Sequence, residues 1–324
     1  MKYSEHAINV MTARTFKGVG RAWIVNNLSS KKTDNEIVNL LNFSTRERAE
    51  ITVNDFKKKK TTLRKIISES KGVIDGVVAI GDEKFPQHYG SVKNSEKPVF
   101  LFYKGDLSLL YSNNHTIAVI GLLKPTIEIE EIERRLVSQL VSNGVVIVSG
   151  LALGCDTIAH RQALDSNGKT VAILPGPLSN ISPAENKPLS DEIVAAGGLL
   201  ITEYLNPPRS KREMIGRYQE RDRLQALFSN SVVLSASYAK NDLGNDSGSR
   251  LAMGYAKNYL IPRAVIYDDT KHADDPMFDL NRQVIQEDKN VIIYNETIGE
   301  LAIERLLDPD RVSISQTPVQ RSII

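Results

Sequence analysis

The sequence predicts a doubly wound, mostly parallel α/β sheet preceded by a small helical domain. Three observations support this fold class. From about residue 76 onward, short apolar runs alternate with amphipathic segments. Two of the apolar runs end abruptly at glycine, in Ile120-Gly121 and Ser149-Gly150. Residues 145–176 read as strand, glycine-spaced turn, helix and strand, and such alternation is typical of a parallel sheet covered by helices.

Residues 1–75 predict a basic domain of several short helices, because apolar residues such as Ile37, Leu40 and Leu41 recur at helical spacing. This segment contains 15 Lys and Arg against 8 Asp and Glu, a net charge of +7, whereas the remaining chain carries −5. The lysine run 57–60 indicates either a solvated helix face or a patch for a phosphate backbone.

The next predicted domain, 76–295, contains the sheet, and 296–324 are expected to form a short C-terminal helix and a flexible tail. The run at 264–267 is expected to be the last core strand. Expected strands lie at 77–80, 99–103, 115–120, 145–149, 170–174, 199–202, 232–234 and 264–267. Expected helices lie at 129–140, after Gly154, and at 189–196, 217–228 and 250–259.

Composition narrows the class of protein. Cys155 is the single cysteine of the 324 residues, which excludes an internal disulfide and a cysteine-built metal site. The N-terminus lacks the apolar core of a signal peptide, and no stretch approaches the roughly 18 apolar residues of a membrane span. We therefore expect a cytoplasmic protein without a membrane segment.

The turn after the run 145–149 predicts a binding site for an anion. Ser149, Gly150, Gly154 and Thr157 can offer hydroxyls and backbone N–H groups at the carboxyl end of a parallel strand, next to a helix N-terminus. The alternative is that the two glycines only allow the tight turn. Asp156, His160, Glu185 and Glu203 show no metal-ligand or catalytic spacing, so structural roles are expected and no cofactor is predicted.

An ordered series of motifs resembles the DNA-processing protein A (DprA, also called Smf) family over about residues 80–295. The motifs include Lys97-Pro98-Val99-Phe100-Leu101-Phe102-Tyr103-Lys104-Gly105-Asp106, Ser149-Gly150-Leu151-Ala152-Leu153-Gly154-Cys155-Asp156, Gly168-Lys169-Thr170, Pro183-Ala184-Glu185-Asn186 and Arg221-Asp222-Arg223. The resemblance implies a Rossmann-like fold and a cytoplasmic, homodimeric protein that binds single-stranded DNA and helps to load the recombinase RecA. The family is not known as enzymatic.

The resemblance also implies which residues contact phosphate. Lys169 would do so from the edge of the sheet, although a lone lysine is often simply solvated. Arg221 and Arg223 would bind DNA from one helix-like segment, which also carries Arg217; the alternative is that these arginines pair with acidic neighbours. Those neighbours are Glu213, Glu220 and Asp222.

Further phosphate contacts are expected from three loops. Ser247, Gly248 and Ser249 open a helix and can bind an anion or only cap it. Asn186 and Lys187 lie in a long loop, either at the site or in a surface turn. The family's usual Gly-Ser-Arg is replaced by Gly121-Leu122-Leu123-Lys124. Lys124 supplies a positive charge but cannot form the two parallel hydrogen bonds to phosphate that an arginine can. Candidate stacking rings are Tyr204, Tyr218 and Tyr238.

Two other classes of function stay open. The fold is similar to that of phosphoribohydrolases and nucleotide sensors, which would use the same glycine-lined pocket for a small nucleotide. The stretch that corresponds to the hydrolase loop is 246–250, and no acidic residue occurs from Ser247 to Arg263, which argues against hydrolysis. The third possibility is an interaction protein in which the sheet only supports a dimer or a recombinase contact.

Overall fold

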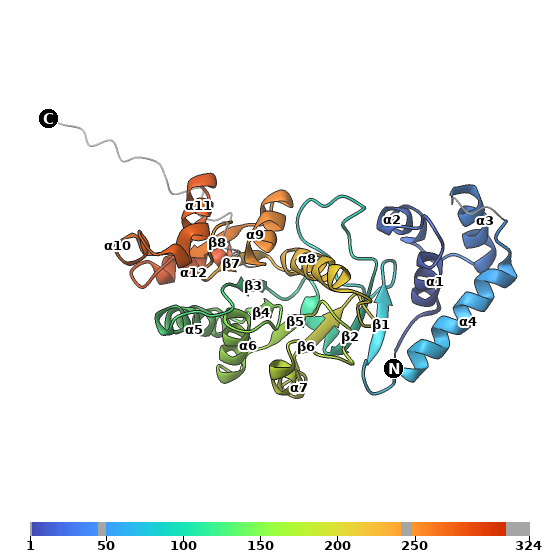
Figure 1. The fold of residues 1–324 in the computed structure, drawn as a ribbon, viewed down its shortest axis with the longest axis horizontal. Coiled ribbons are helices and arrows are strands. Elements are labelled where there is room, and N and C mark those ends of the chain that lie inside the picture. Colours follow the sequence, from blue (N-terminus) through green and yellow to red (C-terminus); the bar gives the residue numbers. More distant parts are fainter. Residues whose placement is uncertain (1, 45–49, 241–247, 309–324) are drawn as a thin grey trace.

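The computed structural model describes residues 2–44, 50–240 and 248–308. Within them, nine strands form one sheet in the order β1-β2-β6-β5-β4-β3-β7-β8-β9. The neighbours from β6 to β9 pair in parallel, whereas β1 pairs with β2, and β2 with β6, in antiparallel fashion. The predicted doubly wound, mostly parallel sheet with N-terminal helices is therefore confirmed (Figure 1).

The strands are short and lie close to the predicted runs. Their bounds are β1 (Gly76–Ala79), β2 (Phe100–Gly105), β3 (Thr116–Ile120), β4 (Val146–Ser149), β5 (Thr170–Ile173), β6 (Leu199–Thr202), β7 (Ser231–Leu234), β8 (Arg263–Ile266) and β9 (Ile292–Tyr294). All residues of β3, β4, β5, β6, β7 and β8 are buried, because helices cover both faces of a parallel sheet.

The helices divide between the two faces. α5 (Ile127–Ser142), α6 (Cys155–Asp165) and α7 (Lys187–Ala195) lie on one face of the sheet, and α8 (Lys211–Leu227) and α9 (Ser249–Asn258) lie on the other (Figure 1). The chain proceeds outward from β3 through β4, β5 and β6 and then returns to β7 on the opposite side of β3. This reversal makes β3 and β7 the switch point of the sheet, where ligands of such folds bind.

Four N-terminal helices pack at the β1 end of the sheet: α1 (Glu5–Arg14), α2 (Arg21–Leu28), α3 (Asp34–Ser44) and α4 (Val53–Glu69) (Figure 1). Their core is continuous with the sheet, since one cluster of buried side chains contains Ile8 and Phe56 together with Phe102 and Leu200. Thr52 begins α4 with a reciprocal capping box to Asp55. The domain boundary at residue 75 stays a prediction.

The expectation that 264–267 is the last core strand is wrong, because β9 extends the sheet beyond β8 in the register Val265↔Ile293. A three-residue apolar run carries too little periodicity to identify a strand. Between β8 and β9 lie α10 (Asp269–His272) and α11 (Asp279–Glu287), and after β9 lies the predicted C-terminal helix, α12 (Gly299–Leu307). The predicted flexible tail lies within residues 309–324, which are outside the described residues.

The helix predicted to begin at Arg217 begins six residues earlier, at Lys211, where the hydroxyl of Ser210 accepts a hydrogen bond from the backbone N–H of Glu213. Its first turns contain only Met214 and Ile215 as large apolar residues, and these two neighbours do not form an apolar stripe.

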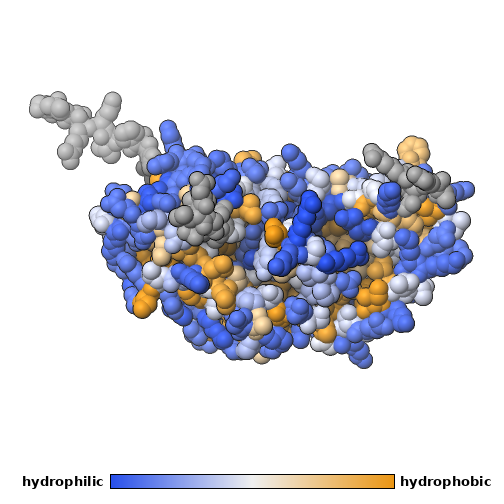
Figure 2. Space-filling model, in the orientation of Figure 1, coloured by the Kyte–Doolittle hydropathy of each residue, from blue (hydrophilic) through white to orange (hydrophobic). Residues whose placement is uncertain are grey.

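The surface in Figure 2 is mainly hydrophilic, and its apolar side chains form small scattered groups. No helix in the described part of the chain is long and apolar enough to cross a membrane.

Candidate functional site

A cavity of about 420 Å³ opens at the switch point, at the carboxyl ends of β3 and β4. The loops after these two strands, the first turns of α6 and α9, and one face of α8 form its wall. Its lining residues are Ile120, Gly121, Leu123, Lys124, Gly150, Ala152, Leu153, Asp156, Ser182, Pro183, Tyr218, Arg221, Asp222, Gln225, Gly248 and Ser249. The structure therefore brings six of the predicted site residues together: Gly121, Lys124, Gly150, Arg221, Gly248 and Ser249.

The backbone donors of the glycine turn are occupied by a carboxylate of the chain itself. Oδ2 of Asp156, in the first turn of α6, accepts hydrogen bonds from the N–H groups of Gly150 and Ala152, each at 3.2 Å. An acidic side chain in the first turn of a helix is favoured by the helix dipole. Asp156 thus lies where the sequence predicted a ligand phosphate.

Arg221 is the central cation of the cavity and is only 7% exposed. Its Nη1 lies 3.3 Å from Oδ2 of Asp156, and its Nε lies 3.1 Å from Oδ1 of Asp222. Two carboxylates therefore hold one side of the guanidinium, while Nη2 forms no hydrogen bond with any described residue. The ring of Tyr218 lies 5.8 Å from the guanidinium carbon.

Gly150 has to be glycine for a packing reason. A Cβ atom at this position would lie 1.1 Å from Nη1 of Arg221 and 2.8 Å from Oδ2 of Asp156. Gly154 has a different reason, because its φ of +75° belongs to the region that favours glycine. Both glycines thus serve the local geometry, which also shapes the cavity.

The loop after β3 is fixed against two helix N-termini. The carbonyl of Leu122 accepts a hydrogen bond from the N–H of Cys155 at 2.9 Å, and the carbonyl of Gly121 accepts one from the hydroxyl of Ser249 at 2.9 Å. Lys124 lies at the rim and forms no ion pair with a described residue, so its charge is available to a ligand. Ser247 lies outside the described residues.

Burial changes the protonation of two carboxyls near the cavity. Burial raises the pKa of Asp222 to about 7, while the positive charge of Arg221 opposes this shift and Asp156 adds to it. Glu133 of α5 is completely buried beside Cys155 and Ser235. Burial raises the pKa of Glu133 to about 8, so this side chain is mainly neutral at pH 7.

The other predicted polar groups of these loops have structural partners. The hydroxyl of Ser149 donates to the carbonyl of Val119 at 2.7 Å, and that of Thr157 donates to the carbonyl of Ala152. The amide of Asn186 donates to the carbonyls of Leu151 and Ala152, which ties the long loop to the turn after β4. His160 is buried, and its Nδ1 lies 2.7 Å from the hydroxyl oxygen of Thr170, within hydrogen-bonding distance. Burial lowers the pKa of His160 to about 4.

Lys169 and Lys187 do not join the cavity. Lys169 precedes β5 and therefore lies at the amino-terminal edge of the parallel strands, opposite the edge that carries Gly150. Its ammonium donates to the carbonyl of Ala196. Lys169 therefore lies at an edge of the sheet, as expected, but at the edge a full strand length away from Arg221 and the cavity. Lys187 pairs with Asp191 on the exposed surface of α7.

Arg223 faces away from Arg221, as two helical residues two positions apart must. It is 2% exposed and pairs with Glu203 at 2.7 Å and with Glu220 at 3.2 Å. Arg217 pairs with Glu213 at 2.7 Å. The structure therefore confirms the alternative in which these arginines pair with Glu213, Glu220 and Asp222. The guanidinium of Arg223 is fully engaged in buried ion pairs.

Sequence reasoning named Asp222 as a possible partner of Arg221 but missed Asp156, which is 65 residues away in the chain. The signal that pointed to Asp156 was its place two residues after Gly154, in the first turn of the helix. Tyr218 lines the cavity, whereas Tyr238 packs against the core and Tyr204 contacts Arg217.

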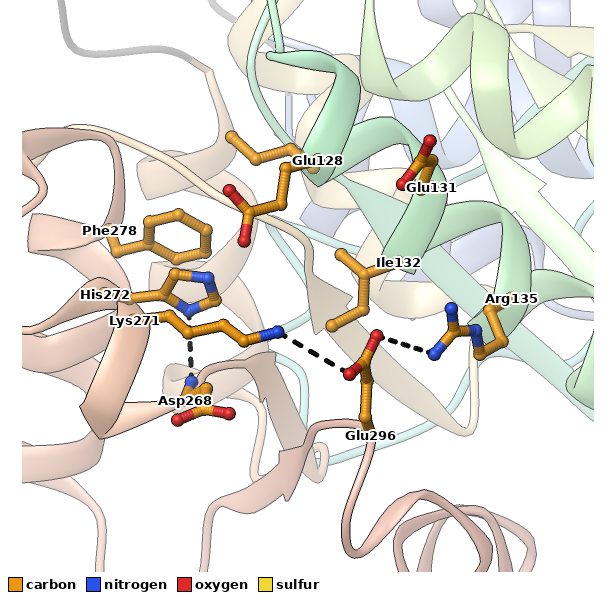
Figure 3. A pocket seen from close by; sticks show the side chains of 10 residues that line it. Glu128, Glu131, Ile132, Arg135, Asp268, Lys271, His272, Phe278 and Glu296 are labelled. Carbon is orange, nitrogen blue, oxygen red and sulfur yellow. Dashed lines mark hydrogen bonds and ion pairs between the residues drawn. The ribbon is translucent and has the colours of Figure 1, made fainter.

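A second cavity, of about 180 Å³, lies between α5 and the segment after β8. Figure 3 shows Lys271 and Arg135 both reaching Glu296, with nitrogen–oxygen distances of 3.5 and 2.7 Å. The ring of His272 stacks on Phe278. Four carboxylates line this cavity, from Glu128, Glu131, Asp268 and Glu296, which disfavours a polyanion. No described group of His, Cys, Asp and Glu side chains is arranged to hold a metal ion.

Comparison with known proteins agrees with this geometry. A family model described as DNA recombination-mediator protein A matches residues 76–300, which include the whole sheet and both walls of the cavity. The chain belongs to this recombination-mediator family. The resemblance inferred from the sequence motifs is thereby confirmed.

Two curated relatives illustrate the extent of the likeness. DNA processing protein DprA of Bacillus subtilis is 30% identical over 157 residues, which is 48% of this chain and 50% of the relative. DprA of Streptococcus pneumoniae is 38% identical over 127 residues, covering 39% of this chain and 43% of the relative. The matches thus span about half the length of such recombination-mediator relatives, and the whole protein's partners are a matter for proposal.

Solved structures of recombination mediators share the fold. The structure of DprA from Streptococcus pneumoniae aligns with a TM-score of 0.68 at 24% identity, covering 93% of this chain and 98% of that chain. A structure of DprA from Helicobacter pylori, described as giving insight into its single-stranded DNA binding mode, aligns with a TM-score of 0.56 at 27% identity. It covers 72% of this chain and 96% of that chain.

Proposed function

We propose that this chain binds single-stranded DNA in the switch-point cavity and acts as a mediator that loads a RecA-type recombinase. The observation that carries the proposal is the arrangement of Arg221. Its Nε and Nη1 are held by Asp222 and Asp156, which leaves Nη2 for a phosphate oxygen. Charge-assisted hydrogen bonds from a fixed guanidinium are the usual means of gripping phosphate.

The rest of the cavity suits a nucleotide unit. Tyr218 offers a ring next to Arg221, on which a base can stack. Leu123 and Leu153, which are 58% and 43% exposed, add apolar surface to the wall. Lys124 adds a second charge at the rim. Membership of the recombination-mediator family and the description of the Helicobacter pylori relative support the same ligand.

The mediator role implies further properties, all proposals here. The protein would act in the cytoplasm as a homodimer, without catalysing a reaction, and would contact the recombinase once the strand is bound. Incubation of purified protein with a RecA-type recombinase and single-stranded DNA should increase the amount of recombinase on the strand. If the amount of recombinase on the strand is unchanged while the protein still binds DNA, the loading role is refuted and only the DNA-binding role is kept.

The test of DNA binding uses fluorescence anisotropy with a labelled strand of about twenty nucleotides over a salt series. Lys124→Gln should weaken binding about 3- to 10-fold and reduce the salt slope by about 0.7, the value for one phosphate contact on a single strand. The matched control is Lys169→Gln, which removes the same charge from the opposite edge of the sheet and should leave the affinity nearly unchanged. Equal losses in both variants would show that only overall charge matters.

A small nucleotide is the second candidate ligand, because a cavity of about 420 Å³ falls in the range of small-molecule sites. Hydrolysis is disfavoured, since the two carboxylates in the wall, Asp156 and Asp222, are both engaged with Arg221. Nucleoside monophosphates that compete with the labelled strand at micromolar concentration would favour a sensor. Competition only near the millimolar range is expected for a DNA-binding protein.

A further inference from the structure

We propose that a strand bound in the switch-point cavity continues across α8 onto the N-terminal helices, through a second DNA-contacting surface. This surface, here called the arginine track, consists of Arg217, Tyr204, Arg21, Arg14 and Lys59. The proposal rests on the proposed function, because it names where the same strand goes after it leaves the cavity. It gives the basic N-terminal helices a role in affinity and in the length of strand that is recognised.

The first step of the track repeats the chemistry of the cavity one turn away. Arg217 precedes Arg221 by four residues, so it lies on the same face of α8 about 6 Å along the helix axis. Its guanidinium carbon lies 4.1 Å from the ring centre of Tyr204, a cation–π contact. Arg217 is buried and pairs with Glu213, so it holds the ring of Tyr204 in place. Tyr204 is only partly buried, and its ring is the part of this pair that a base can contact.

The second step crosses from the sheet to the N-terminal helices. Nη2 of Arg21, the first residue of α2, lies 3.0 Å from Glu203 and 2.8 Å from Glu220. Glu203 also pairs with Arg223, so one carboxylate joins α2 to α8 and holds the two parts in a fixed relation. A strand that follows the surface past Tyr204 therefore meets the N-terminal helices without a flexible gap.

Arg14 is the next cation along this path. It is exposed, its Nη1 donates to the carbonyl of Val19, and it forms no ion pair within the described chain. Burial of part of its side chain and the positive charge of Arg21 lower the pKa of Arg14, while Glu203 and Glu220 oppose the shift. A phosphate beside Arg14 would supply the opposite charge that this guanidinium lacks among the described residues.

The track ends on α4, where the lysine run of the sequence lies. Nζ of Lys59 donates to the carbonyl of Thr15, the residue after Arg14, and lies 4.3 Å from the ring centre of Phe16. Lys60, by contrast, is buried and pairs with Glu5 and Asp34. The run is therefore divided, and Lys59 is the member that extends the track.

The charge balance along this path favours a polyanion. The acidic residues beside it are Glu203, Glu213 and Glu220, and each is already paired with an arginine. Arg14 and Lys59 have no carboxylate partner among the described residues. Alternating cations and aromatic rings are typical of surfaces that bind single strands without sequence preference, because the rings accept any base.

The test compares two strand lengths in the full chain. The affinity for oligo-dT strands of about 6 and about 25 nucleotides is measured for the wild type and for the double variant Arg14→Gln/Lys59→Gln. The short strand should bind both proteins equally. The long strand should bind the double variant about 5- to 20-fold more weakly, with a salt slope reduced by about 1.4, because two phosphate contacts are lost.

The matched control is Lys57→Gln/Lys71→Gln, which removes two charges from the same N-terminal part. Lys57 and Lys71 are exposed; Lys57 lies about 200° around α4 from Lys59, and Lys71 follows the end of the helix. A control that loses as much as the double variant, or a double variant that binds the long strand normally, would overturn the track. Failure of the wild type to bind either strand would instead refute the proposed function itself.

Discussion

Oδ2 of Asp156 lies 3.3 Å from Nη1 of Arg221 and also accepts hydrogen bonds from two backbone N–H groups of the turn after β4. An internal carboxylate thus occupies the anion site that the glycine turn creates. It holds the arginine in place and also competes with any external anion for it. These two roles predict opposite changes in DNA affinity for Asp156→Asn, which keeps the shape of the side chain and removes its charge.

We expect Asp156→Asn to bind single-stranded DNA about 3- to 10-fold more tightly. The amide oxygen can still accept from the N–H groups of Gly150 and Ala152, while Asp222 continues to hold Arg221, so one competing negative charge disappears. Anisotropy at fixed salt measures the change. The control is Asp165→Asn at the exposed end of the same helix. Weaker binding by Asp156→Asn, with unchanged thermal stability, would mean that positioning outweighs competition.

Gly150→Ala should abolish DNA binding and lower the free energy of unfolding by about 1–3 kcal/mol, since the new methyl group would displace the guanidinium of Arg221. Gly216→Ala is the matched control on α8. No atom lies within 4 Å of a Cβ at Gly216, and alanine is favoured over glycine in a helix by about 0.5–1 kcal/mol. Chemical denaturation and anisotropy on both variants check these results. Normal DNA binding by Gly150→Ala would contradict a role for Arg221.

Replacing Glu133 should change how stability depends on pH. Burial raises its pKa from 4.5 to about 8, so the folded state binds one more proton than the unfolded state between these values. The wild type therefore loses stability as pH rises through this window. Glu133→Gln, which mimics the neutral form, should be more stable than the wild type at pH 8 by about 2–4 kcal/mol, with little difference below pH 4.5.

Denaturant titrations at several pH values would measure this difference. A constant difference across the window would refute the assignment to Glu133. Exposed Glu131 of the same helix offers a control, because Glu131→Gln should leave the pH profile unchanged.

Arg223→Gln should affect folding rather than DNA contact. It would leave Glu203 buried with one of its two cationic partners removed, and breaking a buried ion pair costs about 3–5 kcal/mol. The free energy of unfolding should therefore fall, whereas the affinity of the folded protein at low temperature should change less than 2-fold. A large loss of affinity at unchanged stability would restore Arg223 to the DNA-contacting residues.

Local patterns were enough to predict the architecture. Apolar runs that end in glycine, as at Ile120-Gly121 and Ser149-Gly150, mark the strands and turns because backbone geometry and burial act over a few residues. The patterns failed where they were short or polar. β9 has three residues, and the first turns of α8 carry no apolar stripe. The glycine turn was found because it follows a strand, whereas Lys124 and Arg221 were singled out by the resemblance to the family.

The sequence by itself determined the fold class, the edge of the sheet at which the cavity opens, and the excess of positive charge in the N-terminal helices. Only the tertiary structure decided which cations are available. Arg221 pairs with a residue 65 positions away, and Arg21 is linked to Glu203 across 182 positions. Charge pairing depends on distance in space, and burial makes it strong, so no local pattern separates Arg14 and Lys59, which lack a carboxylate partner among the described residues, from Arg223, which is engaged.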